Sequence, residues 1–132
     1  MLVQITDWRN YYNDGEKFLR TATGGQSNRP EIFTPEILYN IITMAIEKFM
    51  MGFLMYNGDL ADNHTMADMI HSMERHLKLP PDLTSRLLHL DSFQEICSLD
   101  NYSYITPSRS QIDAMLAVAG ETQAFIACRI GL

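Results

Sequence analysis

The 132-residue sequence has few of the residues that would favour a disulfide-stabilised or loop-rich architecture. Two cysteines, Cys97 and Cys128, are too few for a disulfide framework, so we expect buried thiols in a reducing, cytoplasmic compartment. The five prolines stand at positions 30, 35, 80, 81 and 107 and leave long proline-free windows between them. Because proline interrupts helices, these windows favour long helical segments within a single domain, 1–132.

Positively charged residues are also scarce, and so are long hydrophobic runs that contain no charged residue. Ten Lys and Arg against sixteen Asp and Glu leave a net charge of −6, which disfavours binding to nucleic acid or acidic membranes through bulk electrostatics. No secretory leader pattern is visible, since no basic segment precedes the short apolar start. The longest apolar region, 37–56, contains Glu47 and Lys48, whose insertion into a bilayer would cost about 5 kcal/mol. We therefore expect a soluble protein with no membrane span.

What is present is helical periodicity. The hydrophobic fraction of 46% rules out intrinsic disorder. Apolar side chains between positions 7 and 23 recur every three or four residues, which predicts a helix. Thr6 is its expected cap, and Gly24 and Gly25 are its expected end.

The second predicted helix has the clearest boundaries. Thr34, Pro35 and Glu36 supply a cap, a proline at the first helical position and an acid in the first turn, and Asn57–Gly58 ends the helix. After Lys48 this helix is apolar all round, so it must be the centre of a bundle or part of a subunit interface. We predict a dimer interface formed by Met50, Met51, Phe53, Leu54 and Met55.

Further helices are predicted over 65–77, 82–90 and 91–99, with Asp82 and Asp91 as caps. A last helix begins at Ser108 or Ser110 and runs nearly to the C-terminus. No segment has convincing strand alternation. The predicted fold is an all-α, up-and-down bundle of four or five helices.

Metal binding and catalysis find little support in the sequence. His64, Asp68 and His71 share one helical face, but a di-iron bundle needs the carboxylate-x-x-His unit twice. No second unit occurs, and no local Ser–His or Cys–His signature is present. We therefore predict no metal, no cofactor and no catalytic residue. A metal-dependent hydrolase in a helical bundle is kept as a remote alternative.

The order of several short motifs resembles that of the HEPN domains of bacteria and archaea. The second helix contains the run 45–49 (AIEKF), and the third is introduced by 63–70 (NHTMADMI). A tyrosine-rich loop at 101–107 (NYSYITP) precedes an alanine-rich last helix. HEPN domains are small helical bundles, often dimeric, and one branch partners minimal nucleotidyltransferases. The resemblance spans about 7–130 and implies the same kind of bundle.

Two departures bear on function. Ribonuclease members of the family carry an Arg followed after four to six residues by a His, and no such pair occurs here. The Arg-Tyr-Pro-like loop of the nucleotidyltransferase partners is replaced by Tyr104, Ile105, Thr106 and Pro107. RNA cleavage by the family's usual pair is therefore not expected.

The resemblance implies binding rather than turnover: a nucleotide or RNA ligand, or a nucleotidyltransferase partner, held by a homodimer. The predicted ligand contacts are Lys48, His64, Tyr104 and Arg109. Lys48 and Arg109 would meet phosphate, and Tyr104 would stack on a base. The competing hypothesis is an interaction module that dimerises through the apolar half of the second helix and has no small-molecule ligand.

Overall fold

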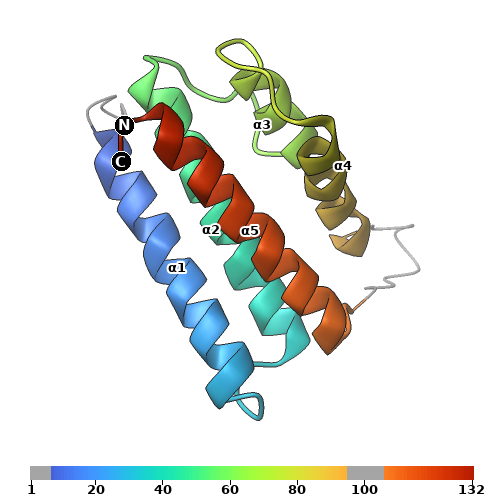
Figure 1. The fold of residues 1–132 in the computed structure, drawn as a ribbon. Coiled ribbons are helices and arrows are strands. Elements are labelled where there is room, and N and C mark those ends of the chain that lie inside the picture. Colours follow the sequence, from blue (N-terminus) through green and yellow to red (C-terminus); the bar gives the residue numbers. More distant parts are fainter. Residues whose placement is uncertain (1–6, 95–105) are drawn as a thin grey trace.

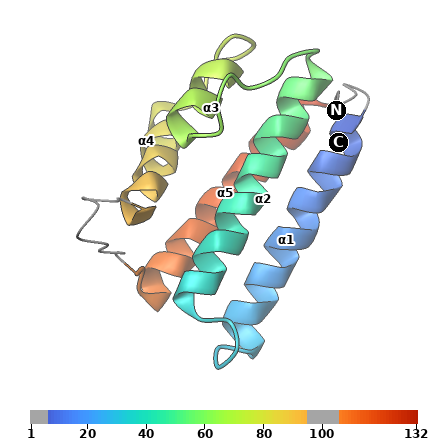
Figure 2. The ribbon, with the colours of Figure 1, turned by 180° about the vertical axis from the view of Figure 1, so that it is seen from behind.

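The computed structural model describes residues 7–94 and 106–132, and within these ranges the chain is helical with no strand. The elements are α1 (Trp8–Asn28), α2 (Pro35–Tyr56), α3 (Met66–Met73), α4 (Pro81–His89), the 3₁₀ helix η2 (Leu90–Gln94) and α5 (Arg109–Arg129). Helix α1 runs antiparallel to both α2 and α5 (Figure 1). The shorter α3 and α4 lie on the other side of α2 and α5 from α1 (Figure 2). The prediction of an all-α bundle is confirmed.

Helix α2 begins and ends where the sequence predicts. The Thr34 side chain accepts a hydrogen bond from the backbone N–H of Ile37, and Pro35 occupies the first turn. At the other end Gly58 adopts φ +73°, a left-handed conformation that glycine reaches without strain. Between these ends α2 packs against α1, α3 and α5.

The apolar half of α2 is the centre of this bundle and is not a free dimer surface. The five residues predicted to form the interface are buried within one chain: Met50 0% exposed, Met51 8%, Phe53 3%, Leu54 0% and Met55 0%. The prediction of a dimer through this set is therefore wrong. Of the two explanations for an all-round apolar helix, burial among neighbouring helices of the same chain is the one realised.

By length and composition, α2 is the one helix in the described ranges that could cross a membrane. Most of that apolar stretch is buried inside the bundle, and the core helix of a soluble protein passes the same test. Packing against three helices thus accounts for its apolarity.

Helix α1 extends through the two glycines predicted to stop it. It continues to Asn28, and Gly25 is buried against the ring of Phe33, where a Cβ atom would lie 2.5 Å from Phe33 Cγ. The absent side chain at Gly25 therefore makes room for the connection to α2. Packing at this site outweighs the weak helix propensity of glycine.

Other predicted boundaries shift in the structure. Helix α3 ends at Met73 instead of residue 77, and α4 begins at Pro81 with no side-chain cap. Asp82 lies in the first turn of α4 and pairs with Arg86 instead of capping the helix. Of the helix predicted over 91–99, the structure describes a 3₁₀ segment as far as Gln94, and the remainder lies outside the described residues.

Helix α5 begins with a capping box, which confirms Ser108 as one of the two predicted start sites. The Ser108 hydroxyl accepts from the backbone N–H of Gln111, and the Gln111 side chain accepts from the backbone N–H of Ser108.

Two glycines allow α1 and α2 to approach closely. A Cβ atom at Gly15 would lie 2.7 Å from Phe49 Cε1 and 3.1 Å from the carbonyl oxygen of Ala45. A Cβ atom at Gly52 would lie 3.1 Å from the carbonyl oxygen of Trp8. Each helix therefore contributes a glycine where it faces the other.

We expect Gly15→Ala to destabilise the protein relative to Gly24→Ala, which changes the same residue type in the same helix. A Cβ atom at Gly24 meets nothing within 4 Å, so its replacement gains helix propensity, worth up to about 1 kcal/mol. At Gly15 the fully buried Phe49 ring must move, which costs roughly 1–3 kcal/mol. Urea unfolding of both variants measures the difference, and equal stabilities would contradict the close approach.

Candidate functional site

Two of the predicted ligand contacts, Lys48 and His64, line the same small cavity. It has a volume of about 210 Å³ and lies between α1, α2 and the connection from α2 to α3. The chain segments bring together an aromatic ring, a cation, an acid, an imidazole and two thioethers. The lining residues are Tyr11, Met44, Glu47, Lys48, Met51 and His64.

Lys48 lies over the ring of Tyr11, with its Nζ atom 4.4 Å from the ring centroid. The negative face of the ring attracts the ammonium group, so this contact orients Lys48 at the edge of the cavity. Both residues are only partly buried, which leaves the ammonium group near solvent. The stem of Lys48 lies where α2 passes from its polar half into its apolar half.

His64 is bonded to Glu47, with 2.5 Å between Nδ1 and Glu47 Oε1. An ionised carboxylate can only accept hydrogen bonds, so Nδ1 carries the proton in this pair. The His64 and Glu47 side chains are 64% and 39% exposed, respectively. The pair is thus accessible to a ligand from solvent.

The connection that carries His64 is held in place by Arg75. The Arg75 guanidinium pairs with Asp59 at 2.9 Å and with Asp62 at 3.1 Å. Asp59 also binds His76 at 2.8 Å, and that hydrogen bond is the main cause of the lowered pKa of its carboxyl group. Both acids of the loop are thus tied to the segment after α3, and these contacts limit where His64 can lie.

A second hollow adjoins the first and shares His64 with it. Its volume is about 430 Å³, and Asn63, Thr65 and Asp91 form the rest of its lining. Burial raises the pKa of the Asp91 carboxyl group, against a smaller opposing effect of the hydrogen bond from the Met66 backbone. His64 thus contributes to the lining of both hollows.

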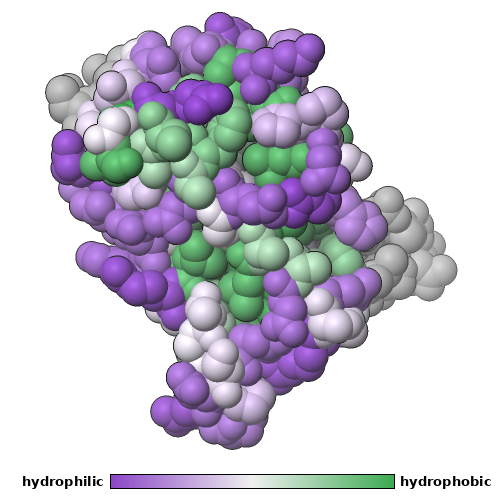
Figure 3. Space-filling model, viewed as in Figure 1, coloured by the Kyte–Doolittle hydropathy of each residue, from purple (hydrophilic) through white to green (hydrophobic). Residues whose placement is uncertain are grey.

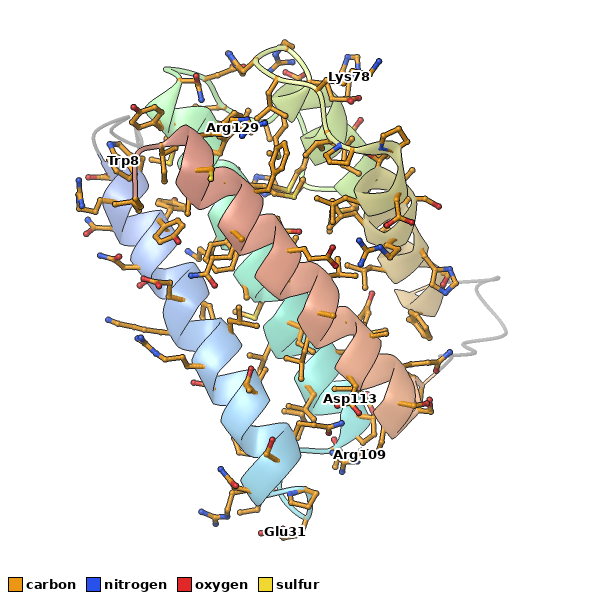
Figure 4. The ribbon with its side chains drawn as sticks, in the orientation of Figure 1. Trp8, Glu31, Lys78, Arg109, Asp113 and Arg129 are labelled. Carbon is orange, nitrogen blue, oxygen red and sulfur yellow. The ribbon has the colours of Figure 1, made fainter. Side chains whose placement is uncertain are left out.

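Arg109, the other predicted phosphate contact, does not line this cavity, and its guanidinium is engaged by other groups of the chain. Its guanidinium binds the carbonyl oxygens of Phe33 at 2.8 Å and Pro30 at 2.7 Å, and the side chain of Gln26 at 2.8 Å. It lies near Asp113 and Glu31, at the end of the bundle where α1 connects to α2 (Figure 4). Lys48 stands fourteen residues along α2 from Thr34, which is about 20 Å of helix.

Four members of the cavity, among them Tyr11 and Glu47, were not predicted as ligand contacts, and one predicted contact cannot be placed. Tyr104 lies outside the described residues. Tyr11 belongs to the apolar stripe of the first helix, where the spacing of an aromatic binding residue is the same as that of a core residue. Glu47 lies within the 45–49 motif beside Lys48, so that motif was the available signal.

The trio His64, Asp68 and His71 is not assembled into a metal site. His64 faces Glu47, and Asp68 accepts a hydrogen bond from the Thr65 hydroxyl at 2.8 Å. Within residues 7–94 and 106–132, no three His, Cys, Asp or Glu side chains are grouped so that they could hold a metal ion.

A larger apolar groove lies between α4–η2 and α5, with a volume of about 760 Å³. Figure 3 shows hydrophobic residues gathered on this face of the molecule. Arg86, at its edge, is already engaged by Asp82 and by both oxygens of Glu121. The groove therefore offers chiefly apolar contact.

The comparisons with known proteins bear on the fold alone. No known family model matches the chain, and no curated protein matches it either. Among solved structures it is similar to the protein TT1696 from Thermus thermophilus, with a TM-score of 0.73 and 17% identity. The match covers 91% of this chain and 95% of that one. The helical bundle is thus shared with a protein from Thermus thermophilus.

We expect Arg109→Lys to lower stability without affecting the cavity at Lys48. A lysine cannot hold two carbonyls and an amide in the same planar geometry, so roughly 1–3 kcal/mol of unfolding free energy is lost. The control is Arg29→Lys in the same connection, whose exposed pair with Glu31 is worth less than about 1 kcal/mol. Thermal unfolding compares the two, and equal losses would contradict the structural role of Arg109.

Proposed function

We propose that this protein is a non-catalytic, HEPN-like domain that binds a nucleotide or RNA ligand at the cavity of Lys48 and His64. The supporting observation is that an ammonium group, an imidazole and the ring of Tyr11 converge there from three segments of the chain. Nothing in the comparisons names a ligand. The proposal therefore rests on the chemistry of the cavity and on the family resemblance of the motifs.

Each group has a role that its chemistry permits. The Lys48 ammonium would bind a phosphate, and His64 would donate a hydrogen bond to it. Tyr104 keeps its proposed role of stacking on a base, while the Tyr11 ring orients the Lys48 ammonium group. Because the net charge is −6, the ligand must be held by these few groups and not by a basic surface.

The family resemblance adds two partners to the proposal: a nucleotidyltransferase protein and a second copy of this chain. A cytoplasmic location is proposed separately, from the low number of cysteines. Copurification with a coexpressed minimal nucleotidyltransferase tests the first partner.

We expect Lys48→Ala to weaken binding of adenosine monophosphate, or of a short RNA, by tenfold or more. The lost charge-assisted contact to phosphate is typically worth roughly 1.5–3 kcal/mol. Lys78→Ala is the control, because Lys78 is exposed and lies on the connection between α3 and α4, outside the cavity lining. Calorimetry measures both variants. No heat from either ligand with the natural protein at millimolar concentration contradicts the proposal.

A second candidate function is self-association through the outer face of the first half of α2. Ile37 and Met44, seven residues apart on one helical face, are each 44% exposed, and Ile41 between them is partly buried. Exposed apolar residues in such a row indicate a contact surface more readily than single ones do. This surface replaces the buried set first predicted.

We expect Ile37→Glu to dissociate a dimer formed in this way, because it places a charge in an apolar contact. Ile32→Glu serves as the control, since Ile32 is 50% exposed in the connection before α2. Sedimentation measures the mass of each protein over a range of concentrations. A natural protein that stays monomeric at high concentration removes this candidate.

A further inference from the structure

One of the two anion-binding groups of the cavity, His64, is already in contact with a carboxylate of the chain itself. Glu47 Oε1 accepts the hydrogen bond from His64 Nδ1 at 2.5 Å. Glu47 also neighbours Lys48 in the sequence and lines the same cavity. A ligand phosphate that used Lys48 and His64 would therefore enter a space next to an existing negative charge.

We propose that Glu47 determines the ligand specificity of this cavity by competing, as an internal anion, with the ligand phosphate for His64. The inference rests on the proposed function and extends it to a residue with no assigned role. In the structure described here Glu47 holds His64, so phosphate binding requires that this hydrogen bond be exchanged. The site thereby discriminates against free inorganic anions and selects ligands that gain further contacts.

The further contacts would come from the ring of Tyr11 and from the hollow beyond His64. Tyr11 provides an aromatic surface, and Asn63 and Thr65 provide hydrogen-bonding groups in the adjoining space. A nucleotide can use these groups in addition to its phosphate, whereas inorganic phosphate cannot. Only a ligand with a base or sugar attached thus gains enough contacts to offset the free energy lost when Glu47 is displaced from His64.

The surroundings do not neutralise Glu47 in another way. The charged and titratable groups that line the two hollows with it are Lys48, His64, Tyr11 and Asp91. Lys48 is directed over the Tyr11 ring, and Asp91 is an acid that lines the second hollow together with His64. His64 is therefore the one lining group of these hollows with a hydrogen bond to Glu47 among the described contacts.

Glu47→Gln separates competition from a merely structural role. The glutamine oxygen can still accept the hydrogen bond from His64, so the connection keeps its anchor while the charge is removed. Competition predicts that the variant binds phosphate-bearing ligands more tightly. A structural anchor predicts unchanged or weaker binding.

The test compares inorganic phosphate, adenosine monophosphate and adenosine by calorimetry at low salt. We expect Glu47→Gln to bind the first two roughly three- to tenfold more tightly than the natural protein, because one repulsive charge near the phosphate is gone. Adenosine should bind both proteins equally. The gain should shrink at high salt, since ions screen an exposed carboxylate.

Glu36→Gln is the matched control. It makes the same change of charge on the same helix, eleven residues or about 16 Å from Glu47, and should leave all three affinities unchanged. Glu47→Ala provides a second variant that removes both the charge and the acceptor. It should bind adenosine monophosphate more tightly than the natural protein does, but less tightly than Glu47→Gln does.

The possible outcomes separate this inference from the proposed function. If the natural protein binds adenosine monophosphate and Glu47→Gln fails to bind it more tightly, the competition is refuted while ligand binding stands. If neither the natural protein nor either variant binds any probe, the proposed function fails and this inference fails with it. Tighter binding by both charge variants together supports the internal anion over the structural anchor.

Discussion

The rest of this structure depends on the close approach of α1 to α2. Gly15 on α1 and Gly52 on α2 remove the side chains that would hold the two backbones apart. The approach lets Tyr12 pack on Phe49, with 5.4 Å between their ring centroids. Their neighbour Tyr11 is placed beside Lys48 by the same contact. The core and the candidate site thus share one constraint.

Helix α2 serves two purposes along its length. Its C-terminal half is enclosed by α1, α3 and α5, while Glu36, Asn40, Thr43 and Glu47 leave a polar stripe on the first half. The Glu47–Lys48 pair lies where the polar stripe ends and the enclosed apolar half begins. A charged side chain there can keep its head in water while its stem packs on apolar neighbours. This position explains why the candidate site lies at the edge of the core.

The similarity to the protein from Thermus thermophilus shows how loosely such a bundle constrains its side chains. A TM-score of 0.73 is reached with 17% identity, so the fold is shared while most residues differ. Cores tolerate many substitutions that keep volume and patterning. A shared bundle therefore says nothing about the cavity at Lys48, whose chemistry depends on a few individual residues.

Local signals in the sequence determined much of the architecture. The spacing of apolar residues indicates a helix from neighbouring positions alone. The cap at Thr34 and the serine before α5 depend on hydrogen bonds within one turn. Each of these features was predicted. The continuation of α1 through Gly24 and Gly25 was not predicted. The ring of Phe33 fills the space at Gly25, and it lies on a later segment of the chain. The pattern around Met50–Met55 was also ambiguous, since burial within a chain and burial between chains produce the same apolar helix.

In the candidate site, too, local signals predicted some features and contacts between distant segments decided the others. Lys48 and His64 were singled out by motifs, and the structure brings them to one cavity. Arg109 has the right chemistry for phosphate, but the fold places it against the backbone carbonyls of the α1–α2 connection. Tyr11 and the bond from Glu47 to His64 arise from contacts between separate segments. The sequence by itself determined which residues could bind an anion; only tertiary packing decided which are accessible, because hydrogen-bonding capacity is local and its satisfaction is not.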